Sequence, residues 1–236
     1  RFGSSLAVDD LDFHLPEGSL CAFMGANGAG KSTTLSMLTG QSRPTSGSAV
    51  VGGVDPARAS AHLQRILGTV PDRLALFDHL TLEEHLLMVG QVHGLKSGVV
   101  RDRAERLLCL LGLESRRHCQ ADHASHGMRK KTALGMALMH GPRVLLLDEP
   151  FEGLDPAAAQ VLQGLLKSFA ANGGTVLFSC HILSVVSNLA DRCLMMAGGR
   201  LVKDLSREAL VDMEHETHFL IPIPTVDLTW LMSSRS

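Results

Sequence analysis

The segment from Gly25 to Thr33 has the residue types and the spacing of a loop that binds phosphate. It satisfies the pattern G-x-x-x-x-G-K-[ST], and the candidate nucleotide contacts along it are Gly25, Asn27, Gly28, Ala29, Gly30, Lys31, Ser32 and Thr33. Glycines let the backbone curl until successive N–H groups point at phosphate oxygens, and the helix that follows adds the partial positive charge of its N-terminus. Lys31 would place a positive charge on the β- and γ-phosphates, and the Ser32 hydroxyl can bind Mg²⁺. The loop therefore predicts a site for a nucleoside triphosphate and Mg²⁺, with Lys31 among the catalytic groups.

Other interpretations of this loop are weaker. One alternative is a Gly-rich turn that binds no ligand. Here, however, the apolar run 20–24 precedes the loop and a helix-like stretch to Leu38 follows it, as the motif requires. The glycine spacing is not the G-x-G-x-x-G of dinucleotide-binding folds, and the HRD and DFG motifs of protein kinases are absent.

Two adjacent carboxylates, Asp148 and Glu149, end a second buried-strand run at 144–147. A carboxylate at a strand tip suits the second protein contact to a metal ion, which is the role expected of Asp148. Glu149 could orient or deprotonate an attacking water. An acidic turn that only ends the strand is the alternative, and the phosphate-binding loop elsewhere in the chain favours the catalytic interpretation.

The elements expected around these residues alternate between strands and helices, which predicts an α/β fold with a mostly parallel sheet and crossover helices. We expect strands at 6–15, 20–24, 48–51, 65–70, 144–147 and 175–179, and a hairpin over 191–205. Helical signals fill the stretch between, beginning with a capping box at 81–84. The prediction is one domain over 1–210 with a helical insert at about 73–140, followed by an irregular tail at 211–236.

Composition narrows the class of protein. The chain has 236 residues, with 22 basic and 24 acidic side chains and a net charge of −2, which argues against a general nucleic-acid surface. Five cysteines without a CxxC pair indicate a reducing compartment. No run reaches the roughly 20 apolar residues that a membrane helix needs. No secretory signal or initial Met is present, so we expect the numbering to start inside a longer product.

The order of motifs resembles that of the nucleotide-binding subunits of ATP-binding cassette (ABC) transporters, over roughly residues 2–210. Ser125-His126-Gly127-Met128-Arg129 lies where the family has its LSGGQ-like signature, and Glu152-Gly153-Leu154-Asp155 matches its D-loop. His181 matches the switch histidine, and Phe2 lies where an aromatic residue stacks on adenine. The wording of these motifs is most similar to that of bacterial ABC-2-type exporter ATPases.

The resemblance implies a P-loop NTPase core with a mostly parallel sheet, an antiparallel β subdomain and an inserted α-helical subdomain. It implies that two such domains close face to face, so that Ser125 and Gly127 of one contact the ATP bound by the other. His181 would bond to the γ-phosphate or hold the water near Glu149. The implied function is an ATP-binding and ATP-hydrolysing subunit that energises a separate multi-span permease, as an exporter, at the inner face of the cell membrane.

Three positions depart from the family pattern. Asp72 stands where a Gln is common after Val70-Pro71, and it could reach Mg²⁺ directly or through water. His126 replaces a signature glycine and adds bulk at the dimer seam, and Phe2 replaces a Tyr. The strand expected before Phe2 is missing. These departures leave open a nucleotide-binding module with impaired turnover, and a soluble ABC ATPase that does not act in transport is a second alternative.

Several smaller groups of residues have simpler interpretations. The group His118, Cys119, His123 and His126 could suggest zinc, but its spacing matches no familiar module. The run 129–131 is basic and is interpreted as a solvated helix face. Cys180 is expected to be a small buried residue at a strand end. Leu74, Leu76 and Phe77 are candidate contacts for a membrane partner, with core packing as the alternative.

Overall fold

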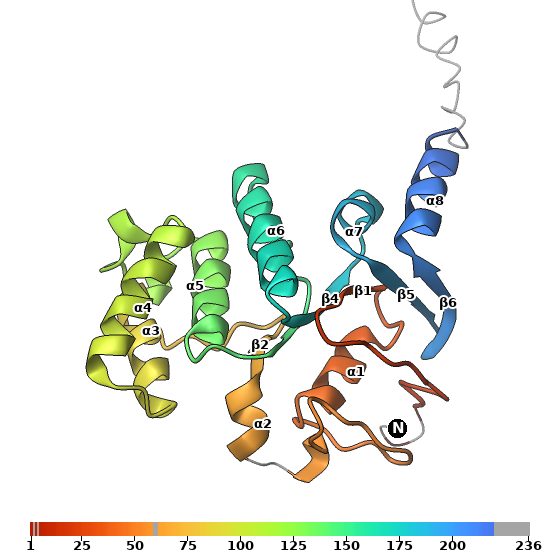
Figure 1. Cartoon of the computed structure of the whole chain (residues 1–236), viewed down its shortest axis with the longest axis horizontal. Helices are drawn as coiled ribbons and strands as arrows, with labels where there is room; N and C mark the ends of the chain where they lie inside the picture. Colours follow the sequence, from red (N-terminus) through yellow and green to blue (C-terminus); the bar gives the residue numbers. More distant parts are fainter. Residues whose placement is uncertain (2, 4, 59–60, 220–236) are drawn as a thin grey trace, which may run out of the picture.

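The protein is described here by a computed structural model that covers residues 1, 3, 5–58 and 61–219. Its centre is a six-stranded sheet in the order β2-β3-β4-β1-β5-β6 (Figure 1). The strands are β1 (Leu20–Met24), β2 (Leu67–Val70), β3 (Val144–Leu147), β4 (Thr175–Cys180), β5 (Arg192–Ala197) and β6 (Arg200–Ser206). The four pairs from β2 to β5 are parallel, and only β5 and β6 pair antiparallel among the described strands. The carboxyl ends of the parallel strands therefore lie along one edge of the sheet.

Helices cover both faces of this sheet. In Figure 1, α6 and α7 lie on one side and α1 and α2 on the other. The helices are α1 (Lys31–Leu38), α2 (Ala61–Ile66), α3 (Leu82–Val92), α4 (Ser97–Leu110), α5 (His126–Leu138), α6 (Pro156–Ala171), α7 (Leu183–Leu189) and α8 (Arg207–Phe219). Short 3-10 turns occur at Pro56–Arg58, Glu114–Arg116 and Ala121–His123.

The central strands are apolar on both faces, as a covered parallel sheet requires. Alternate residues of β1 divide between two cores: Leu20 and Ala22 pack with α5, α6 and α7, whereas Cys21 and Phe23 pack on the α1 side. This two-sided burial fixes the register of β1. It also fixes where the loop after Met24 emerges.

The helical insert forms a lobe of α3, α4 and α5 beside the sheet (Figure 1). The predicted capping box is present: Glu84 N–H donates to Thr81 Oγ1 over 3.2 Å, and Thr81 N–H donates to Glu84 Oε2 over 2.7 Å. Leu82 and Leu86 are fully buried in the lobe. No helix in the described part of the chain combines the length and the apolar character that a membrane span requires.

Two of the expected strands are wrong. Residues 6–15 keep the predicted alternation, with Leu11 and Phe13 half-buried and Asp12 exposed, but they form no ladder. Residues 48–51 contribute only an isolated bridge between Val51 and Val54. Alternation reports which side chains face a core, whereas a strand also needs a neighbour with free backbone groups.

The tail also differs from expectation. Helix α8 continues to Phe219, so residues 211–219 are helical rather than irregular, and α8 packs against α7 and β6. Leu210 is fully buried there, which explains why a segment with a weak apolar pattern is helical. The rest of the predicted tail, 220–236, lies outside the described residues.

Candidate functional site

The loop between β1 and α1 has the expected curled backbone. Gly30 has φ +105°, and a Cβ there would lie 2.7 Å from the carbonyl oxygen of Ala7, so only glycine fits. Residues 26–28, which include Asn27 and Gly28, are exposed, whereas Ala29 is buried beneath them. The N-terminal turn of α1 therefore begins under an open arc of backbone, as anion binding requires.

Lys31 lies inside this arc. Its side chain is 6% exposed, and Nζ donates to the carbonyl oxygens of Gly25, over 2.7 Å, and Ala26, over 3.3 Å. The Glu149 carboxylate lies 3.8 Å from the same nitrogen. A nearly buried ammonium group needs compensating oxygens, and phosphate oxygens would supply stronger ones than the carbonyls do.

Asp148 and Glu149 follow β3, at the carboxyl edge of the sheet beside the loop. Asp148 is 7% exposed, and its Oδ1 accepts a 2.6 Å hydrogen bond from Ser179 Oγ at the end of β4. The backbone N–H of Glu149 donates to the same hydroxyl over 2.6 Å. One serine therefore fixes both acidic residues against the neighbouring strand.

Glu149 has φ +45°, a left-handed conformation that is uncommon for a residue with a side chain. This turn brings the carboxylate between two partners, with His181 Nδ1 3.1 Å from Oε2 and the Lys31 ammonium group on the other side. His181 is 54% exposed on its side chain and Glu149 is 15% exposed. The structure thus brings together Lys31, Asp148, Glu149 and His181, although they come from three separate parts of the sequence.

The residues predicted to bind a metal fit Mg²⁺. Ser32 is exposed in the first turn of α1, next to Lys31, and the hydrogen bond from Ser179 engages only Oδ1 of Asp148. Mg²⁺ is usually held by one or two carboxylates together with phosphates and water, so a cluster of ligands is not needed. Asp72 is exposed, two residues after Val70, whose carbonyl accepts from the N–H of Asp148 over 2.8 Å. Asp72 as a metal ligand stays a prediction.

The signature residues lie at the start of α5. Ser125 is its N-cap, and its Oγ accepts from the N–H of Met128 over 3.3 Å. The His126 ring lies against Gly153 of the D-loop: a Cβ on Gly153 would be 2.4 Å from its Cδ2. Gly127 also approaches this turn, with 3.4 Å from its ideal Cβ position to the Gly153 oxygen. In the described residues no hydrogen bond or ion pair joins Ser125 to Lys31, and Phe2 lies outside them.

Two residues of the site were missed by the sequence analysis. Ser179 is a fully buried polar residue in an otherwise apolar strand, which is the signal that could have found it. Lys130 was interpreted as part of a solvated basic face, and this is wrong because Lys130 is only 3% exposed. Its helical neighbours Ala133 and Leu134, three and four positions on, are buried, so the helical period pointed inward.

The competing interpretations of nearby residues are weaker in the structure. No group of three or more His, Cys, Asp or Glu residues within the described ranges could hold a metal ion. His118 Nδ1 lies 3.6 Å from the Glu83 carboxylate, and His123 Nδ1 lies 3.3 Å from that of Asp122. Cys180 is 1% exposed, and burial raises the pKa of its thiol to about 11, so it stays an unreactive thiol at neutral pH, as expected.

Comparison with known proteins agrees with this geometry. The family model described as ABC transporter matches residues 8–152. The chain is 41% identical over 191 residues to the phospholipid-transporting ATPase ABCA7 of Homo sapiens, which covers 81% of this chain and 9% of that protein. It is 34% identical over 201 residues to the linearmycin resistance ATP-binding protein LnrL of Bacillus subtilis (strain 168), covering 85% and 65%. The chain therefore spans about a tenth of the length of the mammalian relative.

Solved structures show the same fold. An ATP-binding subunit of an ABC transporter superposes with a TM-score of 0.80 at 31% identity, covering 90% of this chain and 87% of that one. A dimeric ATP-binding cassette bound to ADP and Pi has a TM-score of 0.76 at 22% identity, covering 85% and 90%. With the family model matching more than half of its length and the nucleotide-site motifs in place, this chain belongs to the ABC transporter family, as an ATP-binding domain.

Proposed function

We propose that the chain binds and hydrolyses ATP and thereby energises transport by a separate membrane-spanning partner, in the direction of export. The observation that carries the proposal is the meeting of Lys31, Asp148, Glu149 and His181 at the carboxyl ends of β1, β3 and β4. That edge of an open parallel sheet is where ligands bind in α/β proteins.

The proposed chemistry assigns one task to each group. The loop N–H groups and Lys31 would hold the β- and γ-phosphates, with Lys31 exchanging its carbonyl partners for phosphate oxygens. Ser32 and Asp148 would hold Mg²⁺, which would supply positive charge to the phosphates. Glu149 would orient or deprotonate the attacking water, and His181, already 3.1 Å from its carboxylate, would hold the water or bond to the γ-phosphate.

A second nucleotide-binding domain completes the proposed site. Ser125 and Gly127 stand at the N-terminus of α5, a helix of 13 residues whose partial positive charge favours an anion. Among the described residues of one chain, no hydrogen bond or ion pair joins them to Lys31, which suits a role toward ATP on a second copy or a related domain. The dimeric cassette with ADP and Pi supports this arrangement.

The membrane partner would dock on the lobe side. Phe77 is 61% exposed, whereas Leu74 packs partly against the core, so only part of the predicted surface is free. The Phe77 N–H donates to Nε2 of the buried His85 in α3 over 2.9 Å, and this bond holds the segment around Phe77 against the lobe. Relatives described as a phospholipid-transporting ATPase and as a resistance ATP-binding protein support a transport role at the inner face of the membrane. The net charge of −2 gives no reason to propose nucleic acid.

Mg²⁺-dependent ATPase activity of the purified chain tests the enzymatic part. Glu149→Gln should reduce turnover to background while ATP still binds, whereas Glu17→Gln, an exposed control, should keep wild-type turnover. Equal turnover in Glu149→Gln would remove Glu149 from the chemistry. A wild-type chain that binds ATP without hydrolysis would favour the module with impaired turnover.

Purification of the tagged chain from its native membranes tests the transport part. We expect a multi-span protein to co-purify in stoichiometric amounts, and Phe77→Asp to reduce that yield without changing ATP binding. Isolation with a ribosome or another soluble assembly instead would favour an ABC ATPase outside transport.

A further inference from the structure

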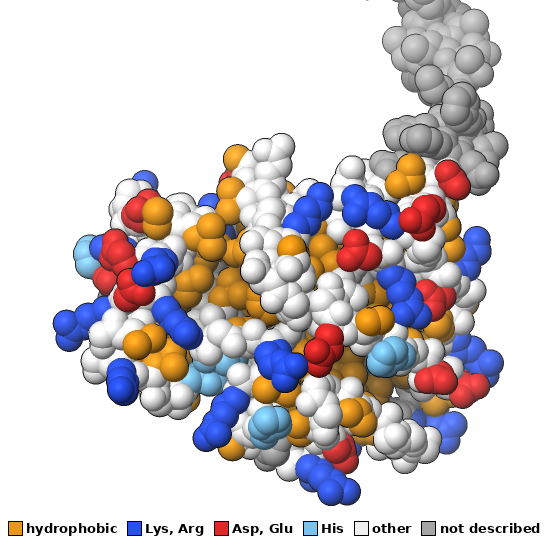
Figure 2. Space-filling model, in the orientation of Figure 1, with side chains coloured by type: hydrophobic (Ala, Val, Ile, Leu, Met, Phe, Trp, Pro, Cys, Tyr) orange, Lys and Arg blue, Asp and Glu red, His pale blue; other side chains and the backbone are white. Residues whose placement is uncertain are grey.

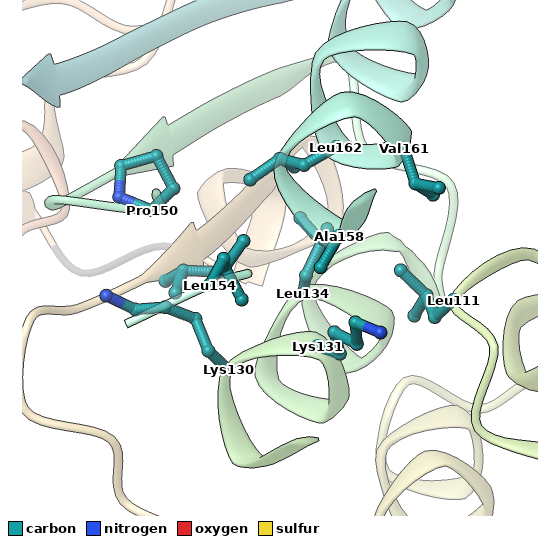
Figure 3. Close-up of a pocket in the computed structure, with 10 residues that line it drawn as sticks. Leu111, Lys130, Lys131, Leu134, Pro150, Leu154, Ala158, Val161 and Leu162 are labelled. Atoms are coloured by element: carbon teal, nitrogen blue, oxygen red, sulfur yellow. The ribbon is translucent and has the colours of Figure 1, made fainter. Parts of the chain in front are cut away.

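Lys130 is a buried cation that the chemistry above does not use. It leaves the second turn of α5 and is 3% exposed. Its Nζ donates to the backbone carbonyl oxygens of Glu149, over 2.5 Å, and Glu152, over 3.2 Å. Figure 3 shows the side chain running away from α5 past Leu154, on the side where Pro150 lies. The ammonium group therefore sits inside the turn that carries the candidate catalytic carboxylate.

The burial of this charge requires compensation. An ammonium group loses its hydration when buried and must recover it from polar partners. In the described part of the chain no carboxylate lies within 4.0 Å of Nζ, so the two carbonyl oxygens are its direct partners. Burial lowers the pKa of Lys130, and the more distant charges of Glu152 and Asp72 act against that shift. Burying this ammonium group costs free energy, which indicates that Lys130 has a role in the turn.

The backbone conformation of Glu149 indicates what this role is. Its φ of +45° is a conformation that an L-residue keeps only when its surroundings hold it. The N–H of Glu149 is held by Ser179 over 2.6 Å, and its carbonyl is held by Lys130. Both peptide groups of one strained residue are thus fixed, and the carboxylate is directed between Lys31 and His181.

We propose that Lys130 is a positioning residue for ATP hydrolysis, whose ammonium group fixes the 149–152 turn to α5 and so sets the position of the Glu149 carboxylate. The proposal rests on the proposed function, since it gives Glu149 a role toward the attacking water. It adds a physical link, because α5 also begins with Ser125 and Gly127. A shift of α5 would therefore be transmitted to Glu149 through the Lys130 side chain.

Three variants test this link by steady-state kinetics. Lys130→Met keeps the length of the stem without the donor, and it should lower kcat by about 10- to 100-fold, as a small displacement of a catalytic group does. KM for ATP should stay within about 2-fold, because the phosphate contacts are retained. Lys130→Arg should restore most of kcat. Lys131→Met, the neighbouring lysine in the same helix, is the matched control and should keep wild-type values.

Peptide-level hydrogen exchange provides a readout that does not depend on turnover. In Lys130→Met the amides of 149–154, which include the Glu152 N–H bonded to the Glu149 carbonyl over 3.2 Å, should exchange faster than in wild type and in Lys131→Met. If Lys130→Met does not fold, Lys130→Gln replaces it in both measurements.

The outcomes separate the two proposals. Wild-type kcat and wild-type exchange in Lys130→Met would overturn the positioning role while leaving the ATPase intact. Equal losses in kcat for Lys130→Met and Lys131→Met would overturn it as well. A wild-type chain without ATPase activity would overturn the proposed function, and the exchange data would then decide whether Lys130 fixes the turn.

Discussion

The hydroxyl of Ser179 donates a 2.6 Å hydrogen bond to Oδ1 of Asp148. The Ser179 hydroxyl oxygen also accepts the N–H of Glu149 over 2.6 Å, so a single side chain on β4 joins the tip of β3 to its neighbour. Ser179 is fully buried and Asp148 is 7% exposed, so water is poorly placed to replace the hydroxyl. The precision of the candidate site therefore depends on a residue that would not touch the nucleotide.

Ser179→Ala should damage both stability and turnover. It leaves a buried carboxylate oxygen and a backbone N–H without their partner, and each such loss costs about 1–3 kcal/mol. We expect the midpoint of urea unfolding to fall and kcat to fall with it. Ser97→Ala, at an exposed position in α4, is the control and should change neither. Unchanged unfolding of Ser179→Ala would show that the two hydrogen bonds are not formed in solution.

Gly153→Ala should be destabilising because two effects act on one atom. The residue has φ +73°, and the added Cβ would lie 2.4 Å from the His126 ring. We expect a loss of about 1–3 kcal/mol in the free energy of unfolding from the backbone strain together with the clash. Gly94→Ala is a matched control, since Gly94 has φ +72° and no atom within 4 Å of the new Cβ.

A double-mutant cycle separates the clash from the strain. His126→Gly in the Gly153→Ala background removes the ring that meets the new Cβ and should recover the part of the loss that exceeds Gly94→Ala. Additive effects of the two substitutions would show that His126 does not lie against the D-loop.

His140 should make stability depend on pH. Its ring stacks on that of His93 with a 4.0 Å centroid separation, and Nε2 bonds to the Leu67 carbonyl over 3.1 Å. Burial, followed by the charge of His93, lowers the pKa of His140 from 6.5 to about 4. Between those values the unfolded chain binds more protons than the folded chain, so stability is lost as the pH falls through this window.

Urea unfolding at pH 7 and pH 5 measures this effect. The slope from one such group is at most about 1.4 kcal/mol per pH unit, and His140→Gln should flatten the wild-type dependence. His62→Gln, at an exposed position in α2, should leave the dependence unchanged. A wild-type slope retained in His140→Gln would assign the pH dependence to other groups.

The parts of the fold that depend on nearby residues could be predicted from the sequence. The capping box at Thr81 and the N-cap at Asp155, whose Oδ1 accepts the Ala158 N–H over 2.9 Å, are local chemistry within one helical turn. The phosphate-binding loop and the strand before Asp148 are equally local. The family resemblance supplied His181, Ser125 and Gly127.

The parts that depend on packing between distant segments could not be predicted. Lys130 differs from its neighbours only in facing the turn at Glu149, 19 residues away, and a basic residue in a helix is usually solvated. The apolar hollow beside α6, visible in Figure 2, likewise arises where the lobe meets the core and is lined by residues of α5 and α6 such as Leu134 and Val161. At 6–15, alternation gave the correct buried face but no information on a pairing partner.

Measuring the nucleotide affinity of Lys31→Ala is the sharpest test of the phosphate-binding loop. Equilibrium binding of ATP with Mg²⁺ should be readily measurable for the wild type and for Lys167→Ala, an exposed control on α6. We expect Lys31→Ala, with its melting curve unchanged, to bind ATP at least about 10-fold more weakly, since a charge-assisted contact to phosphate is lost. Wild-type affinity in Lys31→Ala would contradict the assignment of this loop as the phosphate site.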